Sequence, residues 1–310
     1  MQLEGPSPRD VDVCRALLQR GSKSFSMAAR WLPARVREPA TVLYAFCRVA
    51  DDAVDTAPDA TAATIDTLRS RLDRIYAGRP GDDAVDRALA AVVARERIPR
   101  VLPDSLLDGM LWDAEGRRYQ TLDDLSAYAA RVAGTVGAMM SLVMGCRQAD
   151  LLARACDLGV AMQLTNIARD VGEDARLGRV YLPLQWLRMA GIDPDRWMAA
   201  PAHDERLACV VARLLGAADE LYARADDGIA RLPLDCRPAI HAARTIYAEI
   251  GQSIASNGFD SVSRRATVSR SRKLWLVARA TAARSFPTRE ASPPPLESTR
   301  FLVAACAEIQ

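Results

Sequence analysis

Helical periodicity runs through nearly the whole 310-residue chain and constrains its fold more than any other feature. Apolar residues recur at helical spacing, whereas alternating β-branched runs are scarce. Turn-like stretches such as GRPGD at 78–82 and AGIDPD at 190–195 separate the periodic segments. We therefore expect an all-α fold. The expected helices are 8–20, 36–57, 61–77, 83–97, 103–118, 123–145, 148–175, 204–231, 234–256 and 269–284.

The pattern predicts a single helical catalytic domain over residues 1–285, with its helices packed around a shared centre. The stretch FPTREASPPPLEST at 286–299 is typical of a Pro/Ser-rich linker, and a short C-terminal helix is expected in the remainder of 286–310. The longest uncharged run, residues 132–146, is too short to span a bilayer, which needs about 20 residues. No signal-peptide pattern opens the chain.

The composition argues against several classes of function. A net charge of +2 gives no indication of nucleic-acid binding. With only His203 and His241, a histidine zinc site or a histidine-based nucleophile relay is close to excluded. The seven cysteines are scattered without a CxxC pair, which is typical of reduced thiols and predicts a cytoplasmic protein.

The pentapeptide DDAVD occurs twice, and the two copies differ in context. The copy at 82–86 follows a glycine and opens a helix, where carboxylates cap free N–H groups. The first copy follows the apolar run TVLYAFCRVA and places Asp51, Asp52 and Asp55 at the end of a helix, one turn apart on one face. Because like charges repel there, a positive group must compensate. Arg48 and a bound cation are both candidates.

A second polar group lies on the helix expected at 148–175. Gln163, Asn166, Asp170 and Asp174 follow one another at spacings of 3, 4 and 4, whereas the other faces of this helix are apolar. Burying such a stripe is costly without partners. The stripe is therefore either a ligand site or a solvated face with ordinary ion pairs to neighbours such as Arg169. This helix alone does not decide between the two.

Together the two acidic stripes predict a site for hard cations. Carboxylate and amide oxygens without His or Cys suit Mg²⁺, which completes its shell with water and substrate phosphate. Neighbouring arginines suit bidentate contacts to phosphate oxygens. Apolar walls between the helices would hold a hydrocarbon and keep water from a cation left behind. Tyr44 also belongs here, because a buried tyrosine hydroxyl needs a partner.

The chain resembles a known family, the squalene/phytoene synthases, and most closely their bacterial phytoene-forming members. The resemblance covers nearly the whole chain. It is carried by four motifs: GSKSF at 21–25, YAFCRVADDAVD at 44–55, YAARVAGTVG at 128–137 and QLTNIARDVGEDARLGRVYLP at 163–183. The last motif is highly specific, because it joins the N-x-x-x-D-x-x-x-D stripe to a downstream R-x-Y-x-P.

The resemblance implies an isoprenoid-synthase-type helical bundle with a central active-site cavity. It implies head-to-head condensation of two geranylgeranyl diphosphate molecules through prephytoene diphosphate to 15-cis-phytoene, with release of diphosphate and no NADPH. The implied ligands of several Mg²⁺ ions, or of Mn²⁺ in their place, are Asp51, Asp55, Asn166, Asp170 and Asp174. The implied substrate contacts are Ser22, Lys23, Ser24, Tyr44, Arg48, Gln163, Arg169, Tyr247 and Arg265.

Alternatives stay open. A related enzyme could make presqualene diphosphate, squalene or dehydrosqualene from the shorter farnesyl diphosphate. A non-catalytic helical assembly factor is a hypothesis of another class, which the intact acidic motifs disfavour. The R-x-Y-x-P extension and the SKSF loop argue against a head-to-tail prenyltransferase or a terpene cyclase. The basic stretch 264–284 indicates either a peripheral membrane contact or a solvated face with one or two phosphate contacts. Nothing in the sequence indicates an oligomeric state.

Overall fold

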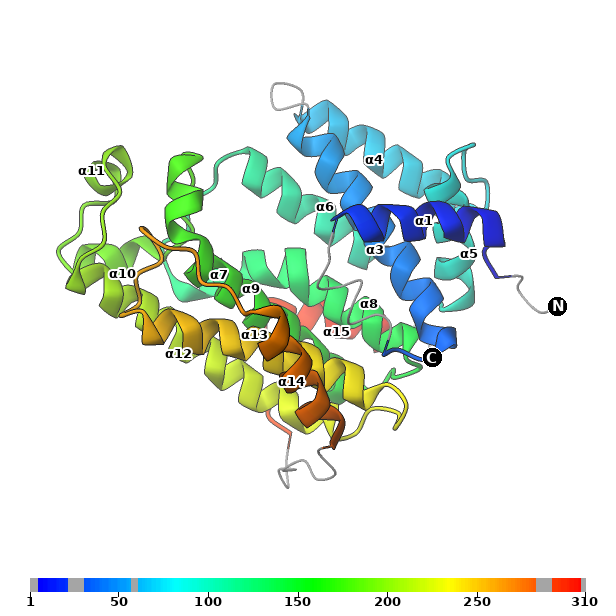
Figure 1. Ribbon diagram of the computed structural model, residues 1–310. Coiled ribbons are helices and arrows are strands. Elements are labelled where there is room, and N and C mark those ends of the chain that lie inside the picture. Colours follow the sequence, from blue (N-terminus) through cyan, green and yellow to red (C-terminus); the bar gives the residue numbers. More distant parts are fainter. Residues whose placement is uncertain (1–4, 22–30, 57–60, 283–291, 308–310) are drawn as a thin grey trace.

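The computed structural model describes residues 5–21, 31–56, 61–282 and 292–307, and every regular element in these ranges is a helix (Figure 1). The expected all-α fold is confirmed. The first elements are α1 (Pro8–Gly21), α3 (Ala34–Asp55), α4 (Thr61–Tyr76), α5 (Ala84–Arg95), α6 (Val101–Ala114), α7 (Leu122–Ala129), the π-helical turn η2 (Ala130–Gly134) and α8 (Thr135–Val143). The later ones are α9 (Ala149–Arg176), α10 (Leu184–Met189), α11 (Pro194–Ala199), α12 (Glu205–Ile229), α13 (Arg237–Ser256), α14 (Arg270–Ala282), the short 3₁₀ turn η3 (Glu297–Thr299) and α15 (Arg300–Ala307).

Helix α9 crosses the middle of the molecule and packs against α8, α12 and α13 (Figure 1). Small residues let its backbone approach η2 and α8 closely. A methyl group added at Gly159 would lie 2.2 Å from the carbonyl oxygen of Ala133, and one at Gly137 would lie 2.1 Å from that of Ala155. Only glycine fits at both positions, so this crossing fixes how α9 sits against the rest of the bundle.

The helix expected at 123–145 is interrupted. A π-helical turn, Ala130–Gly134, separates α7 from α8. Such a turn inserts an extra residue and often marks a functional site. It lies where α6 comes closest, since a methyl group added at Gly109 would lie 2.5 Å from Val132. The turn therefore resets the register between Tyr128 on α7 and the apolar helix α8.

The second DDAVD copy opens a helix as predicted. Asp83 is the N-cap of α5, and its carboxylate accepts hydrogen bonds from the backbone N–H groups of Val85 and Asp86. The short helices α10 and α11 were not expected from the sequence. Helix α10 begins directly after Pro183. Helix α11 begins with Pro194, and the carboxylate of Asp193 caps its N-terminus.

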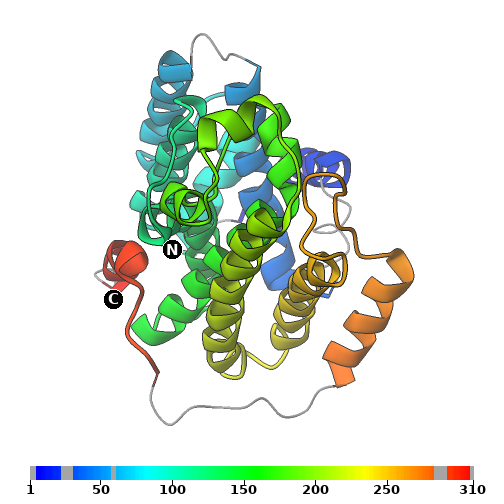
Figure 2. The ribbon, with the colours of Figure 1, turned by 90° about the vertical axis from the view of Figure 1, so that its left-hand side faces the viewer.

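Residues 292–307, placed beyond the catalytic domain by the sequence pattern, pack against the bundle. Leu302 and Cys306 of α15 are fully buried in the main apolar core. The guanidinium of Arg154 on α9 donates hydrogen bonds to the Ser292 hydroxyl at 3.1 Å and to the Pro293 carbonyl at 2.8 Å. Helices α14 and α15 lie on opposite sides of the bundle (Figure 2).

Candidate active site

The first acidic cluster occupies the last two turns of α3, where the negative end of the helix dipole disfavours carboxylates. Arg48 compensates for it, as the sequence suggested. Its guanidinium lies 3.3 Å from Asp51 and donates from Nε to Asp52 at 3.1 Å. Tyr44 lies one turn earlier on the same helix, and burial raises the pKa of its hydroxyl. The side chain of Asp55 lies outside the described part of the chain.

The second cluster is the polar stripe of α9. Asp170 accepts hydrogen bonds from Arg169 Nε at 2.8 Å and from Arg265 Nε at 2.7 Å. Burial alone would raise the pKa of Asp170, but these two arginines outweigh it and hold the pKa below its usual value. One turn on, burial and then repulsion from Asp170 raise the pKa of Asp174 to about 7. The charge of Asp170 is therefore balanced by two arginines. The carboxylate of Asp174 has a raised pKa, and a bound cation would stabilise its ionised form.

The two clusters share one electrostatic environment, connected by Asp113 at the end of α6. Burial raises the pKa of Asp113, and the negative charge of Asp51 on α3 adds a small effect in the same direction. Burial and the charge of Asp170 are the main causes that raise the pKa of Asp174 on α9, and the charge of Asp113 adds a small effect. Charges influence one another in this way only over short distances. That the acidic ends of α3 and α9 face each other across a metal site stays a prediction.

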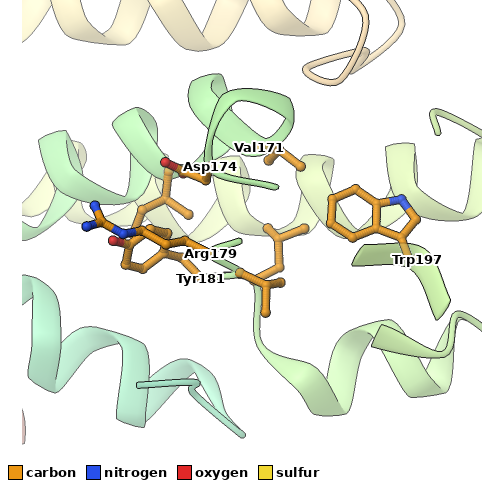
Figure 3. A pocket seen from close by; sticks show the side chains of 8 residues that line it. Val171, Asp174, Arg179, Tyr181 and Trp197 are labelled. Carbon is orange, nitrogen blue, oxygen red and sulfur yellow. The ribbon is translucent and has the colours of Figure 1, made fainter. Parts of the chain in front are cut away.

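A small pocket, with room for about one water molecule, lies at the end of α9. Val171 and Trp197 contribute apolar walls, and Asp174, Arg179 and Tyr181 form the polar side (Figure 3). The pocket is small, and the longer apolar cavity expected for a prenyl chain stays a prediction. Its composition nevertheless places a carboxylate, a guanidinium and an aromatic ring beside apolar side chains.

Comparison with known proteins identifies the family. Residues 18–272 match the family model described as squalene/phytoene synthase. A phytoene synthase of Rhodobacter capsulatus is 56% identical over 271 residues, which cover 87% of this chain and 80% of that protein. A phytoene synthase of Cereibacter sphaeroides is 51% identical, over 96% of this chain and 88% of that protein. The chain belongs to the squalene/phytoene synthase family.

A solved structure supports the same assignment. A dehydrosqualene synthase in complex with a ligand superposes with a TM-score of 0.81 at 31% identity, covering 88% of this chain and 96% of that one. Helices α3 to α13 lie within the matched residues 18–272, so the family likeness includes both acidic clusters. Helix α15 lies beyond them.

The donor set of this squalene/phytoene synthase fits Mg²⁺. Within the ranges that the structure describes, no three Asp, Glu, His or Cys side chains converge into a preformed metal site. However, Asn166 Oδ1 is buried and has no hydrogen-bond partner, which is unusual for an amide oxygen. A cation that takes oxygen ligands would satisfy this atom together with the carboxylates of Asp170 and Asp174.

The structure shows a contact for only some of the other expected substrate-binding residues. Arg265 reaches back from the segment before α14 to Asp170 and to Glu173, at 3.0 Å from the latter. Gln163 on α9 and Tyr247 on α13 are both half-buried. Ser22, Lys23 and Ser24 lie outside the described residues. The roles assigned to all of these residues stay predictions.

Sequence reasoning gave no role to several residues of this region, among them Asp113, Tyr181 and Arg179. Tyr181 and Arg179 belong to the R-x-Y-x-P of the fourth motif, which we used only to recognise the family. Tyr128, in the third motif, was likewise given no role. Asp113 has no motif around it, and only its contacts show its importance.

Proposed function

We propose that this protein is a 15-cis-phytoene synthase of carotenoid biosynthesis. It would condense two geranylgeranyl diphosphate molecules head to head through prephytoene diphosphate and release diphosphate. The polar stripe of α9, with the unpartnered Asn166 oxygen, is the observation that supports diphosphate chemistry. The choice of phytoene over the shorter squalene products is supported by the relative that is 56% identical over most of the chain.

The residues of both clusters have distinct tasks in this proposal. Asp51 and Asp55 on α3 and Asn166, Asp170 and Asp174 on α9 would hold Mg²⁺, or Mn²⁺ in its place. When bound, the metal stabilises the charge that develops on the departing diphosphate.

In this proposal the arginines that pair with these carboxylates would bind the same diphosphate. Arg48 contacts Asp51, and Arg169 and Arg265 contact Asp170. Their guanidinium groups suit bidentate binding of phosphate oxygens once metal neutralises the carboxylates. Ser22, Lys23, Ser24, Tyr44, Gln163 and Tyr247 would complete the substrate contacts.

A product assay tests the proposal. Purified protein is incubated with Mg²⁺ and either geranylgeranyl or farnesyl diphosphate, without NADPH, and the organic extract is analysed by mass spectrometry. We expect a forty-carbon hydrocarbon from the longer substrate, because the carbon count of the product is twice that of the substrate. Chromatography against isomer standards then assigns the central double bond.

The controls separate the alternatives. EDTA should stop the reaction and added Mg²⁺ should restore it; full activity without a divalent metal would refute the metal-site assignment. A thirty-carbon product or intermediate from farnesyl diphosphate alone would move the protein to the squalene branch. No product from either substrate would favour the non-catalytic hypothesis.

We also propose that α14 contacts the membrane surface peripherally. Leu274 and Trp275 of this helix are 59% and 48% exposed. The helix contains no acidic residue, and it carries four basic ones: Arg270, Arg272, Lys273 and Arg279. A basic helix with exposed apolar side chains suits an anionic lipid surface. In the described ranges no helix is both long and apolar enough to cross a bilayer.

Vesicle sedimentation tests this contact. The double substitution Leu274→Ser and Trp275→Ala should reduce the fraction bound to phosphatidylglycerol vesicles at least about threefold, because the apolar area available for insertion is lost. Leu234→Ser is the matched control, since Leu234 is also exposed but lies in the turn before α13. Equal sedimentation of the α14 variant and wild type, or no binding by wild type, would refute this contact.

A further inference from the structure

The 257–269 loop, which joins α13 to α14, lies against α9 beside the second acidic cluster (orange in Figure 1). Its backbone docks at Gly172, whose N–H donates to the Ser261 carbonyl at 2.9 Å. A methyl group added at Gly172 would lie 2.4 Å from the carbonyl oxygen of Val262 and 2.6 Å from its Cα. Only glycine therefore lets the loop approach the acidic stripe so closely.

The loop has a fixed shape of its own. Asp260 Oδ1 accepts hydrogen bonds from the backbone N–H groups of Val262 and Ser263, at 3.1 and 2.9 Å. Phe259, just before this turn, has a φ of 58°, which is rare for a residue with a bulky side chain. Such outliers persist only where the surroundings fix them, and they are frequent at switch regions. The loop is therefore a preformed element with a strained junction to α13.

Arg265 extends from this loop back onto the acidic stripe of α9. Its Nε donates to Asp170 Oδ1 at 2.7 Å, and one terminal nitrogen donates to Asp170 Oδ2 at 3.3 Å. The same guanidinium lies 3.0 Å from Glu173. The side chain of Arg265 is 53% exposed and that of Asp170 is 17% exposed. The arginine therefore covers the carboxylate from the solvent side.

Asp170 keeps no free lone pair for a cation in this arrangement. Arg169 also donates to both of its oxygens, from Nε to Oδ1 and from a terminal nitrogen to Oδ2. An ionised carboxylate has about four lone-pair sites, and the two arginines fill all of them. By contrast, Asn166 Oδ1 has no hydrogen-bond partner among the described residues. The central ligand of the stripe is covered while its neighbour is unsatisfied, which indicates a resting state and not a metal-loaded one.

A diphosphate group can remove this cover. Phosphate oxygens accept the same bidentate guanidinium contacts as a carboxylate, and a diphosphate carries more negative charge. When it binds beside Arg265, the guanidinium exchanges Asp170 for phosphate oxygens. Asp170 then regains lone pairs, which are what a hard cation needs from a carboxylate. No covalent bond changes in this exchange.

We propose that Arg265, held by the 257–269 loop, is a latch that keeps Mg²⁺ from Asp170 until a diphosphate draws the guanidinium away. This inference rests on the proposed function and adds regulation to the same site. The protein then takes up its full metal set only together with a prenyl diphosphate. Because coupling between two ligands is reciprocal, the metal likewise strengthens the binding of diphosphate. Gly172 is a positioning residue, since it acts through the loop.

The substitution Arg265→Gln tests the latch, because it removes the charge and the bidentate contact from an exposed side chain. Mn²⁺, which electron paramagnetic resonance detects directly, is titrated into the protein without diphosphate. The variant should bind Mn²⁺ at least about threefold more tightly than wild type, the size expected for loss of one exposed ion pair. Inorganic diphosphate at saturating Mg²⁺, followed by calorimetry, should bind the variant at least about threefold more weakly. A merely structural role would not tighten metal binding.

Gly172→Ala tests the loop as the element that carries the latch. The added methyl group collides with Val262, so the loop must shift and take Arg265 with it, while alanine favours the helix. Both affinities should change in the same directions as in Arg265→Gln. Gly216→Ala is the matched control, because a methyl group at Gly216 on α12 would meet no described atom within 4 Å. Wild-type affinities in Gly172→Ala would overturn the assignment to the loop.

Arg264→Gln is the control for charge. It removes the same charge from the neighbouring residue of the loop, and its Mn²⁺ affinity should stay within about twofold of that of wild type. Equal tightening in the two arginine variants, or wild-type Mn²⁺ affinity in Arg265→Gln, would overturn the latch. Failure of the proposed function would instead appear as the absence of a forty-carbon product from wild type, whatever the metal affinities.

Discussion

Replacing Asp170 by Asn should lower kcat at least about a hundredfold while the protein stays folded. Loss of a residue that merely orients a metal ligand typically costs 10- to 100-fold, so loss of a ligand itself should cost at least the upper figure. A hundredfold loss corresponds to about 2.7 kcal/mol of transition-state stabilisation. Steady-state kinetics with geranylgeranyl diphosphate at saturating Mg²⁺ measures it.

The matched control for this variant is Glu173→Gln. Glu173 lies on the same helix, carries the same charge and also pairs with Arg265, at 3.0 Å, but it lies outside the N-x-x-x-D-x-x-x-D stripe. We expect its kcat within about threefold of wild type. Thermal unfolding with Mg²⁺ and inorganic diphosphate gives a second readout, since ligand stabilisation should be lost in Asp170→Asn alone. Wild-type turnover in Asp170→Asn would refute the ligand assignment.

Replacing Asp157 by Ala should reduce the free energy of unfolding by about 3–5 kcal/mol, the usual effect of leaving a buried charge without its partner. Asp157 is fully buried on α9, and it accepts hydrogen bonds from Arg154 at 2.8 Å and from Arg224 at 2.9 Å. Arg154 is 1% exposed, so its guanidinium could not recover water. Urea unfolding followed by circular dichroism measures the change.

Asp150→Ala provides the comparison for that experiment. Asp150 lies on the same helix and also pairs with an arginine, Arg231, but both side chains are partly exposed. Exposed ion pairs contribute about 0–1 kcal/mol, so this variant should stay close to wild type. If both variants lost the same free energy of unfolding, burial of the Asp157 ion pair would not increase its contribution to stability.

The sequence predicted the parts of the site that depend on local geometry. The spacing of Asn166, Asp170 and Asp174 places them on one face of a helix wherever that helix packs. Arg48 was named as a compensating charge for Asp51 because the two lie one turn apart, and the structure shows this pair. Such relations follow from the period of the α-helix and need no tertiary information.

What the sequence could not predict depends on contacts between distant segments. Asp113 and Tyr181 are 68 positions apart, and nothing in their spacing indicates that they share a hydrogen bond. The π-helical turn was missed because the residues around it have ordinary helical periodicity. The Pro/Ser composition of 286–299 indicated a linker, although the carbonyls of Pro293 and Pro294 are bound by Arg154 and Arg224.

The packing of residues 292–307 on α9 has a consequence for biosynthesis on the ribosome. The Arg154 guanidinium cannot contact the Pro294 carbonyl until that residue, 140 positions later in the chain, has been translated. Closing so long a loop is slow, so the central helix of the bundle lacks these contacts until the C-terminal segment has been translated. Chaperone contact with the nascent chain should therefore persist until these last segments leave the exit tunnel.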